Sequence, residues 1–246
     1  MRATLAIFTR ELRSYFVSPL AYAVLAAFLF INGLSFATLV GVLNDAPSAV
    51  GSPMELFFGG TILFWLGLAV VAPILPMRLL SEERRSGSLE ILMTAPVTEG
   101  QVVVGKYAAA VAFYFALWLP TLGYAGLMAR HADLDWGPIA SSYLGVLGIG
   151  GLFLAVGIFA SAISRNQLVA ALVAFAIVFA LFVLGLLELL ATSEAAQELL
   201  GYLNLIRHME DFGRGVVDTR CLVYYGSVSL FFLFLSSRVL ATNKWR

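Results

Sequence analysis

One stretch of this sequence has the spacing of a nucleotide-binding motif. Gly100-Gln-Val-Val-Val-Gly105-Lys106 matches the first seven positions of a P-loop, whose backbone amides and lysine hold phosphates. The eighth position is Tyr107 rather than Ser or Thr, so the hydroxyl that would ligate Mg²⁺ is missing. A P-loop also needs a preceding β-strand, whereas Thr98-Glu-Gly-Gln101 resembles a helix capping box. We expect no ATP binding by this chain, and we expect Lys106 to extend its amine to the membrane surface.

His208, Glu210 and Asp211 are the next candidates, for a metal site. Glu210 and Asp211 are adjacent and would not share one face of a helix, and no second histidine lies close in sequence. A hydrogen-bond network explains this cluster better than a metal ion does. Catalytic pairs of acids, bases or nucleophiles are missing as well, so the sequence predicts no catalytic residue, no metal ligand and no cofactor bound by this chain.

The segment between residues 81 and 98 has the composition of a docking element. It opens with the charge cluster Glu82, Glu83, Arg84 and Arg85, and Gly87 permits a sharp turn after it. We expect Ser88 to cap a short helix that carries Glu90 in its first turn and ends at Pro96. The apolar positions of that helix are Leu89, Ile91, Leu92 and Met93. Such a helix suits the groove of a partner protein, although packing of the loop on its own bundle is the alternative.

These segments must be positioned by a membrane-embedded bundle. The chain has 246 residues, of which 61% are hydrophobic and only 12% are charged, and a soluble fold could not bury so much apolar surface. The sequence predicts an all-α polytopic membrane protein forming one transmembrane domain over residues 1–246. The expected spans are residues 20–43, 56–80, 107–128, 139–163, 168–191 and 221–240. The cytoplasmic loop 81–98 and an extracytoplasmic helical loop 192–220 connect them, and residues 194–203 are expected to form an amphipathic helix.

The distribution of basic residues predicts the orientation of these spans. With six spans both termini share one side, which then carries eleven Lys and Arg residues against four on the other side. Basic residues concentrate in cytoplasmic loops, so both termini are expected in the cytoplasm. None of the six spans has an ionisable residue near its centre. This argues against an ion-coupled carrier and against an intramembrane protease.

Residues 4–17 are expected to form an amphipathic elbow helix that lies along the membrane before the first span. Its apolar face carries Leu5, Phe8, Leu12, Tyr15 and Phe16, and its polar face carries Arg10, Glu11 and Arg13. Ser18-Pro19 then breaks the helix. Anchoring in lipid and docking of a partner explain this helix equally well.

The stretch "LSEERRSGSLEILMTAP" at residues 80–96 resembles the signature loop of the ABC type-2 exporter permease family. The pattern consists of acidic and basic residues, then Gly-Ser-Leu-Glu, an apolar pair and proline. Residues 8–22, "FTRELRSYFVSPLAY", and residues 208–225, "HMEDFGRGVVDTRCLVYY", resemble a subgroup, the gliding-motility-associated (GldF-like) permeases.

This resemblance implies a permease subunit that couples ATP hydrolysis in a separate cytoplasmic ATPase, which holds ATP and Mg²⁺, to export. The coupling residues would be Glu82, Glu83, Arg84, Arg85, Gly87, Ser88, Leu89, Glu90, Ile91, Leu92 and Pro96. The elbow helix would contribute Phe8, Arg10, Glu11, Arg13 and Phe16.

The resemblance also implies the partners and the location of the chain. A second permease copy, most simply in a homodimer, and membrane lipid are the expected partners, and an accessory protein with a periplasmic domain is a further candidate. We expect no nucleic-acid partner, and we expect a multi-pass protein of the bacterial inner membrane. The alternative function is a membrane scaffold of a multiprotein machine that uses ATPase-driven movement without a translocated substrate.

Overall fold

The computed structural model describes residues 2–45, 53–88, 97–130 and 135–243. The described residues form helices and no strands, which confirms the predicted all-α class. The helices of the first half are α1 (Arg2–Val17), α2 (Pro19–Asp45), α3 (Pro53–Phe57), α4 (Ile62–Ile74), α5 (Ser81–Ser86), α7 (Glu99–Trp118), η2 (Leu119–Thr121) and α8 (Leu122–Met128). Those of the second half are α9 (Trp136–Ile163), α10 (Gln167–Leu186), η3 (Leu187–Leu190), α11 (Glu194–Leu203), α12 (Leu205–Gly213) and α13 (Thr219–Asn243).

Five helical segments of the described chain are long and apolar enough to cross a membrane. They are α2, the α7–α8 segment, α9, α10 and α13. The expected second span, residues 56–80, is wrong as a continuous helix, because it consists of the end of α3, a break, α4 and a series of turns. The apolar part of α4, Ile62–Val71, is too short to be counted with the other five.

The break between α3 and α4 has a local cause. Gly59 adopts φ 124°, a conformation that side chains with a Cβ rarely tolerate. The Trp65 indole donates a 2.8 Å hydrogen bond to the Gly59 carbonyl oxygen, and Thr61 caps the first turn of α4. The backbone conformation of Gly59 and the cap at Thr61 therefore separate α3 from α4.

Helix α9 is the centre of the bundle. In the most apolar 18-residue window of α9, 78% of the residues are buried. The corresponding share is 22% in α10 and in α13 and 28% in α2. Glycines in α9 let aromatic side chains of neighbouring helices approach its backbone: a Cβ on Gly150 would lie 2.2 Å from Tyr114, and one on Gly145 would lie 2.6 Å from Phe212. These glycine contacts lie within the subunit.

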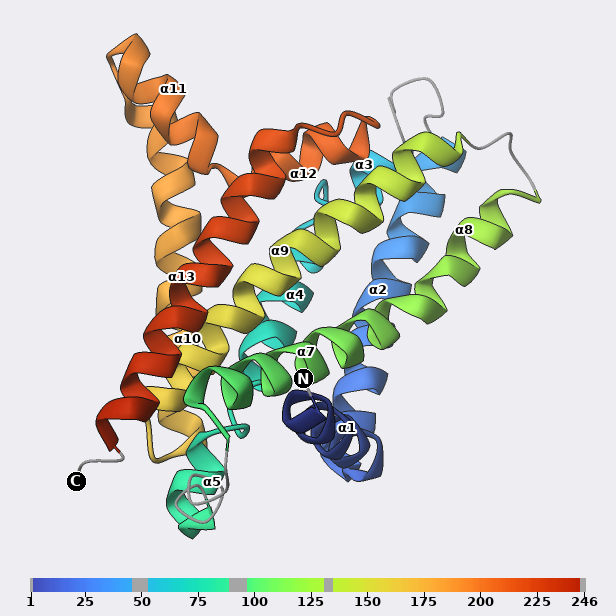
Figure 1. The fold of residues 1–246 in the computed structure, drawn as a ribbon. Coiled ribbons are helices and arrows are strands. Elements are labelled where there is room, and N and C mark those ends of the chain that lie inside the picture. The colour runs from blue at the N-terminus through green and yellow to red at the C-terminus, as the bar shows by residue number, and fades with distance from the viewer. Residues whose placement is uncertain (1, 46–52, 89–96, 131–134, 244–246) are drawn as a thin grey trace.

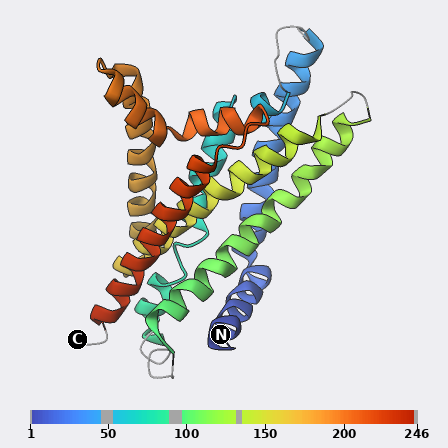
Figure 2. The same ribbon diagram turned by 45° about the horizontal axis from the view of Figure 1, so that its top comes forward.

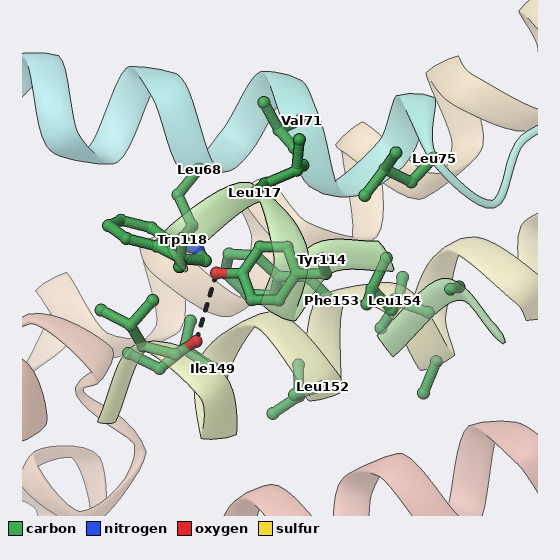
Figure 3. Close-up of a cluster of buried hydrophobic side chains, with 14 of the residues drawn as sticks. Leu68, Val71, Leu75, Tyr114, Leu117, Trp118, Ile149, Leu152, Phe153 and Leu154 are labelled. Carbon is green, nitrogen blue, oxygen red and sulfur yellow. Dashed lines mark hydrogen bonds between the residues drawn. The ribbon is translucent and has the colours of Figure 1, made fainter. Parts of the chain in front are cut away.

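Figure 3 shows the core beside this contact, where Tyr114 and Trp118 of α7 lie between Leu68 of α4 and Ile149 of α9. The Tyr114 hydroxyl donates a 3.2 Å hydrogen bond to the Val146 carbonyl oxygen (dashed in Figure 3), so the buried phenol is satisfied.

The bundle has two distinct ends (Figures 1 and 2). One end, which we call the α5 end, carries α1, α5 and the last turns of α13, so both ends of the described chain lie there. The opposite end, the α12 end, carries α3, α11 and α12. Helix α12 packs on α9 and α3, and α11 projects from the top of α10 (Figure 1).

Candidate functional site

The charge cluster of the loop lies on a helix of its own at the α5 end. Glu82, Glu83, Arg84 and Arg85 form most of α5, with both acids in its first turn and both arginines in its last. This order matches the helix dipole. Gly87 ends α5 with φ 72°, as a left-handed C-cap. The expected coupling helix falls on residues 89–96, including Leu89, Glu90, Ile91, Leu92 and Pro96, which lie outside the described residues.

Four charged side chains from α1, α5 and α7 form a closed ring of ion pairs. The Lys106 amine in α7 lies 2.9 Å from a carboxylate oxygen of Glu11 in α1 and 2.9 Å from one of Glu83 in α5. The Arg10 guanidinium contacts the same two oxygens at 2.6 and 2.8 Å. Two cations thus alternate with two anions, and the ring has no net charge. It ties α1, α5 and α7 together by ion pairs rather than by apolar packing alone.

Two expectations for this region are wrong. Glu11 does not lie on a solvated face with Arg10 and Arg13, because it is 8% exposed and points toward α7. Lys106 does not extend to a surface, because its side chain is fully buried in the ring. The inward face of α1 consists of Ile7, Glu11 and Tyr15, spaced four residues apart, and Phe16 is about half exposed.

The electrostatics of the ring favour a charged Glu11. Burial alone raises the pKa of Glu11, but the charges of Lys106 and Arg10 outweigh that effect and hold the pKa below its ordinary value. A buried ion pair of this kind adds little net stability relative to an apolar pair, yet losing one partner leaves an uncompensated charge. The ring therefore fixes the relative positions of its helices more than it adds stability.

A cavity of about 420 Å³ opens between α1 and α5, next to the ring. Its polar lining includes Arg10, Ser14, Arg78, Glu82 and Glu83. Glu83 uses one carboxylate oxygen for both cations of the ring, and its other oxygen, Oε2, is buried without a hydrogen-bond partner among the described residues. A buried acceptor left in this state is energetically costly.

The turns that lead from α4 into α5 are held by one serine of α9. The Ser161 hydroxyl accepts hydrogen bonds from the backbone amides of Leu80 and Ser81 at 3.1 and 3.0 Å. It donates to the carbonyl oxygen of Met77 at 3.0 Å. In addition, Arg84 of α5 donates to the Ala162 carbonyl oxygen. The position of α5 is therefore fixed against the central helix.

Close packing supports the same turns. Pro76 lies against Gly157 of α9, where a Cβ would come within 2.2 Å of the proline ring. On the other side, the Tyr15 hydroxyl of α1 donates a 2.7 Å hydrogen bond to the Leu75 carbonyl oxygen, and its ring stacks on Phe113 of α7 at 4.8 Å. Movement of α1 or α5 would thus reach α4, α7 and α9 directly.

The α12 end contains a second polar cluster. His208 is 4% exposed, and its Nδ1 lies 3.1 Å from the Tyr225 hydroxyl of α13. Arg207 forms a 2.8 Å ion pair with Glu188, to which the Asn204 side chain also donates. The parts of the chain that the structure describes contain no group of three His, Cys, Asp or Glu residues that could hold a metal ion.

The ring could have been suspected from the sequence. Lys106 is a lysine in an apolar stretch, and a buried lysine requires an anionic partner. The sequence does not show that the partners come from segments 95 and 23 positions earlier in the chain, Glu11 and Glu83. Ser161 gave no signal at all, because a serine within an apolar helix commonly bonds to its own backbone.

Comparison with known proteins adds the family context. Residues 49–208 match the family model described as ABC-2 family transporter protein. The matched range includes α5, Lys106 and Ser161, whereas α1 with Glu11 precedes it. A comparison with curated proteins gave no match.

Proposed function

This chain belongs to the ABC-2 family of transporter proteins, and we propose that it is the permease subunit of an ATP-binding cassette exporter driven by a separate cytoplasmic ATPase. The family and the five apolar helices make it a multi-pass membrane protein that takes part in transport. The observation that carries the proposal is the ion-pair ring, because it joins the charged loop of the family to two further helices of the bundle.

The ATPase would bind at the α5 end, against the exposed side of α5 and the cavity beside α1. Glu82 and Arg85 are exposed there, whereas Glu83 and Arg84 are engaged within the chain. A lysine, arginine or amide donor of the ATPase that enters the cavity would satisfy Glu83 Oε2 if a shift of α5 uncovered this buried oxygen. The segment 89–96 would extend the same contact surface.

Displacement of α5 by the ATPase would then reach the bundle by two routes. One route passes through the ring to Lys106 and α7. The other passes through the Leu80 and Ser81 amides to Ser161 and through Pro76 to Gly157, both in α9. Packed protein interiors deform little. A displacement of α5 would therefore be passed on through the ring and the close-packed turn to α7 and α9.

The remaining parts of the proposal follow from the charge distribution and the family. The α5 end is the cytoplasmic end, because the basic residues concentrate there. Here α3 and α4 together provide the second of six membrane crossings, which brings both termini to one side.

Two copies of the chain form the transporter in the bacterial inner membrane, and ATP and Mg²⁺ bind to the ATPase. Membership of the gliding-motility-associated subgroup, and an accessory protein with a periplasmic domain as a partner, stay predictions.

Crosslinking of the assembled transporter tests this arrangement. The natural cysteine is first removed as Cys221→Ser, and Ser88→Cys is then introduced at the α5 end and Glu198→Cys on α11 as the matched control. Both positions are exposed. With a co-expressed cytoplasmic ATPase, a maleimide–benzophenone reagent attached to the introduced cysteine is expected, on illumination, to join the ATPase to position 88 and not to position 198. Equal yields at the two positions, or a product at 198 alone, would overturn the proposed orientation.

A further inference from the structure

The outer face of α1 carries a positively charged groove that shares only Arg10 with the ring. Helical spacing separates α1 into an inward face, around Glu11, and an opposite face. A shallow groove of about 650 Å³ runs along that opposite face and is lined by Arg2, Leu5, Ala6, Thr9, Arg10 and Arg13. Among the described residues, the lining includes three arginines and no acidic residue.

Two of these arginines are available to a ligand. Arg10 is engaged by Glu11 and Glu83. Arg2 and Arg13 are exposed, and neither forms an ion pair with any residue in the described parts of the chain. Thr9 donates its hydroxyl proton to the Leu5 carbonyl oxygen, so the guanidinium groups are the donors that face the groove.

Exposed apolar side chains lie within this groove and beyond its end along α1. Leu5 is 64% exposed, Phe16 is 47% exposed and Val17 is 81% exposed. They continue into the exposed Leu20 and Tyr22 at the start of α2, a helix whose surface is mostly unburied. Exposed apolar side chains on a membrane protein lie in the hydrocarbon, so the arginines beside them lie at the depth of the lipid headgroups.

We propose that this outer face of α1 binds the headgroups of anionic phospholipids. Arg2 and Arg13, about 16 Å apart along the helix, would each contact a phosphate, with the exposed apolar side chains against the acyl chains. Charge complementarity favours this occupant, because an excess of guanidinium groups meets a negatively charged bilayer surface. Arginine suits the phosphate through its planar pair of donors. The exposed apolar side chains favour lipid over an acidic protein surface, which would leave Phe16 and Val17 in water.

Lipid retention by the full-length protein tests the proposal. The permease is reconstituted in an equimolar mixture of phosphatidylglycerol and phosphatidylcholine, extracted in mild detergent, and the retained lipids are quantified by mass spectrometry. The wild type is expected to retain phosphatidylglycerol preferentially. R2Q/R13Q is expected to lose up to about 25-fold of that preference at low salt, since each basic side chain near an anionic surface contributes about fivefold.

Two further variants complete the test. R130Q/R165Q removes two exposed arginines outside the groove and is expected to keep the preference, and R2K/R13K is expected to keep most of it. All variants are checked for an unchanged melting temperature. An unchanged preference in R2Q/R13Q would overturn the proposal, as would an equal loss in R130Q/R165Q. Unchanged lipid retention with weakened ATPase binding in R2Q/R13Q would assign the groove to a protein partner instead.

Discussion

The amine of Lys106 in α7 lies 2.9 Å from the carboxylate of Glu11 in α1, and the lysine side chain is fully buried. These two residues connect the helix before the first span to the helix after the charged loop. Removing the amine in Lys106→Met leaves Glu11 and Glu83 with Arg10 as the remaining cation of the ring. Since breaking a buried ion pair costs about 3–5 kcal/mol, we expect a markedly lower unfolding temperature in detergent.

A double-mutant cycle separates this ion pair from simple loss of packing. Glu11→Gln with Lys106→Met removes both charges and leaves the Arg10–Glu83 pair in place. We expect the double variant to be more stable than Lys106→Met alone, with a coupling energy of about 1–3 kcal/mol. Additive effects of the two substitutions would contradict the ring as a structural unit.

Ser161→Ala should destabilise the turn before α5. The substitution leaves the buried amides of Leu80 and Ser81 without their acceptor, and each such group costs about 1–3 kcal/mol. Ser237→Ala is the control, because the hydrogen bond of the Ser237 hydroxyl in the described part of the chain stays within its own helix, to the Phe234 carbonyl oxygen. Thermal unfolding of the two variants gives the comparison. A similar small effect of both would show that Ser161 does not hold the turn.

Gly157→Ala should be poorly tolerated, whereas Gly126→Ala should be neutral or stabilising. A methyl group at position 157 would overlap the ring of Pro76, and overpacking of this kind costs about 1–3 kcal/mol. A Cβ on Gly126 meets nothing within 4 Å, and alanine favours a helix over glycine by about 1 kcal/mol. Unfolding temperatures measured side by side check the contrast, and equal shifts in the two variants would contradict the close approach of Pro76 to α9.

The α12 end should lose stability in mild acid through His208. Burial lowers the pKa of His208 below its ordinary value, outweighing the nearby acids Asp211 and Asp218. The folded state therefore prefers the neutral ring, and the stability that this provides is present above about pH 6.5 and declines as the pH falls below it. We expect the melting temperature of His208→Gln to depend less on pH between about 7.5 and 5. An identical pH profile in wild type and variant would exclude His208 as the responsible group.

Much of the helical architecture could be predicted from the sequence, and the errors have a common cause. The long apolar stretches are recognisable because lipid forces the backbone to form helices. The second segment was misjudged because Gly59 and the turns around Pro76 interrupt it, and a hydropathy pattern does not register turn chemistry. The sequence places Glu11 on the polar face of the elbow helix and Lys106 at the membrane surface, because their partners are remote in sequence. A lysine in an apolar stretch indicates that an anionic partner is needed, but tertiary pairing leaves no local pattern that identifies this partner.

The affinity of the ATPase for the permease tests the central claim most directly. Charge reversal is best confined to Glu82→Lys with Arg85→Glu, since these exposed side chains lie outside the ring, whereas Glu83 and Arg84 hold α5 in place. Glu194→Lys with Glu198→Lys on α11 is the control at the opposite end. In nanodiscs, reversal on α5 is expected to weaken ATPase binding about tenfold or more and reversal on α11 to leave it unchanged. Binding that is unaffected by the α5 reversal in a folded permease would contradict the assignment of the α5 end as the site that receives the ATPase.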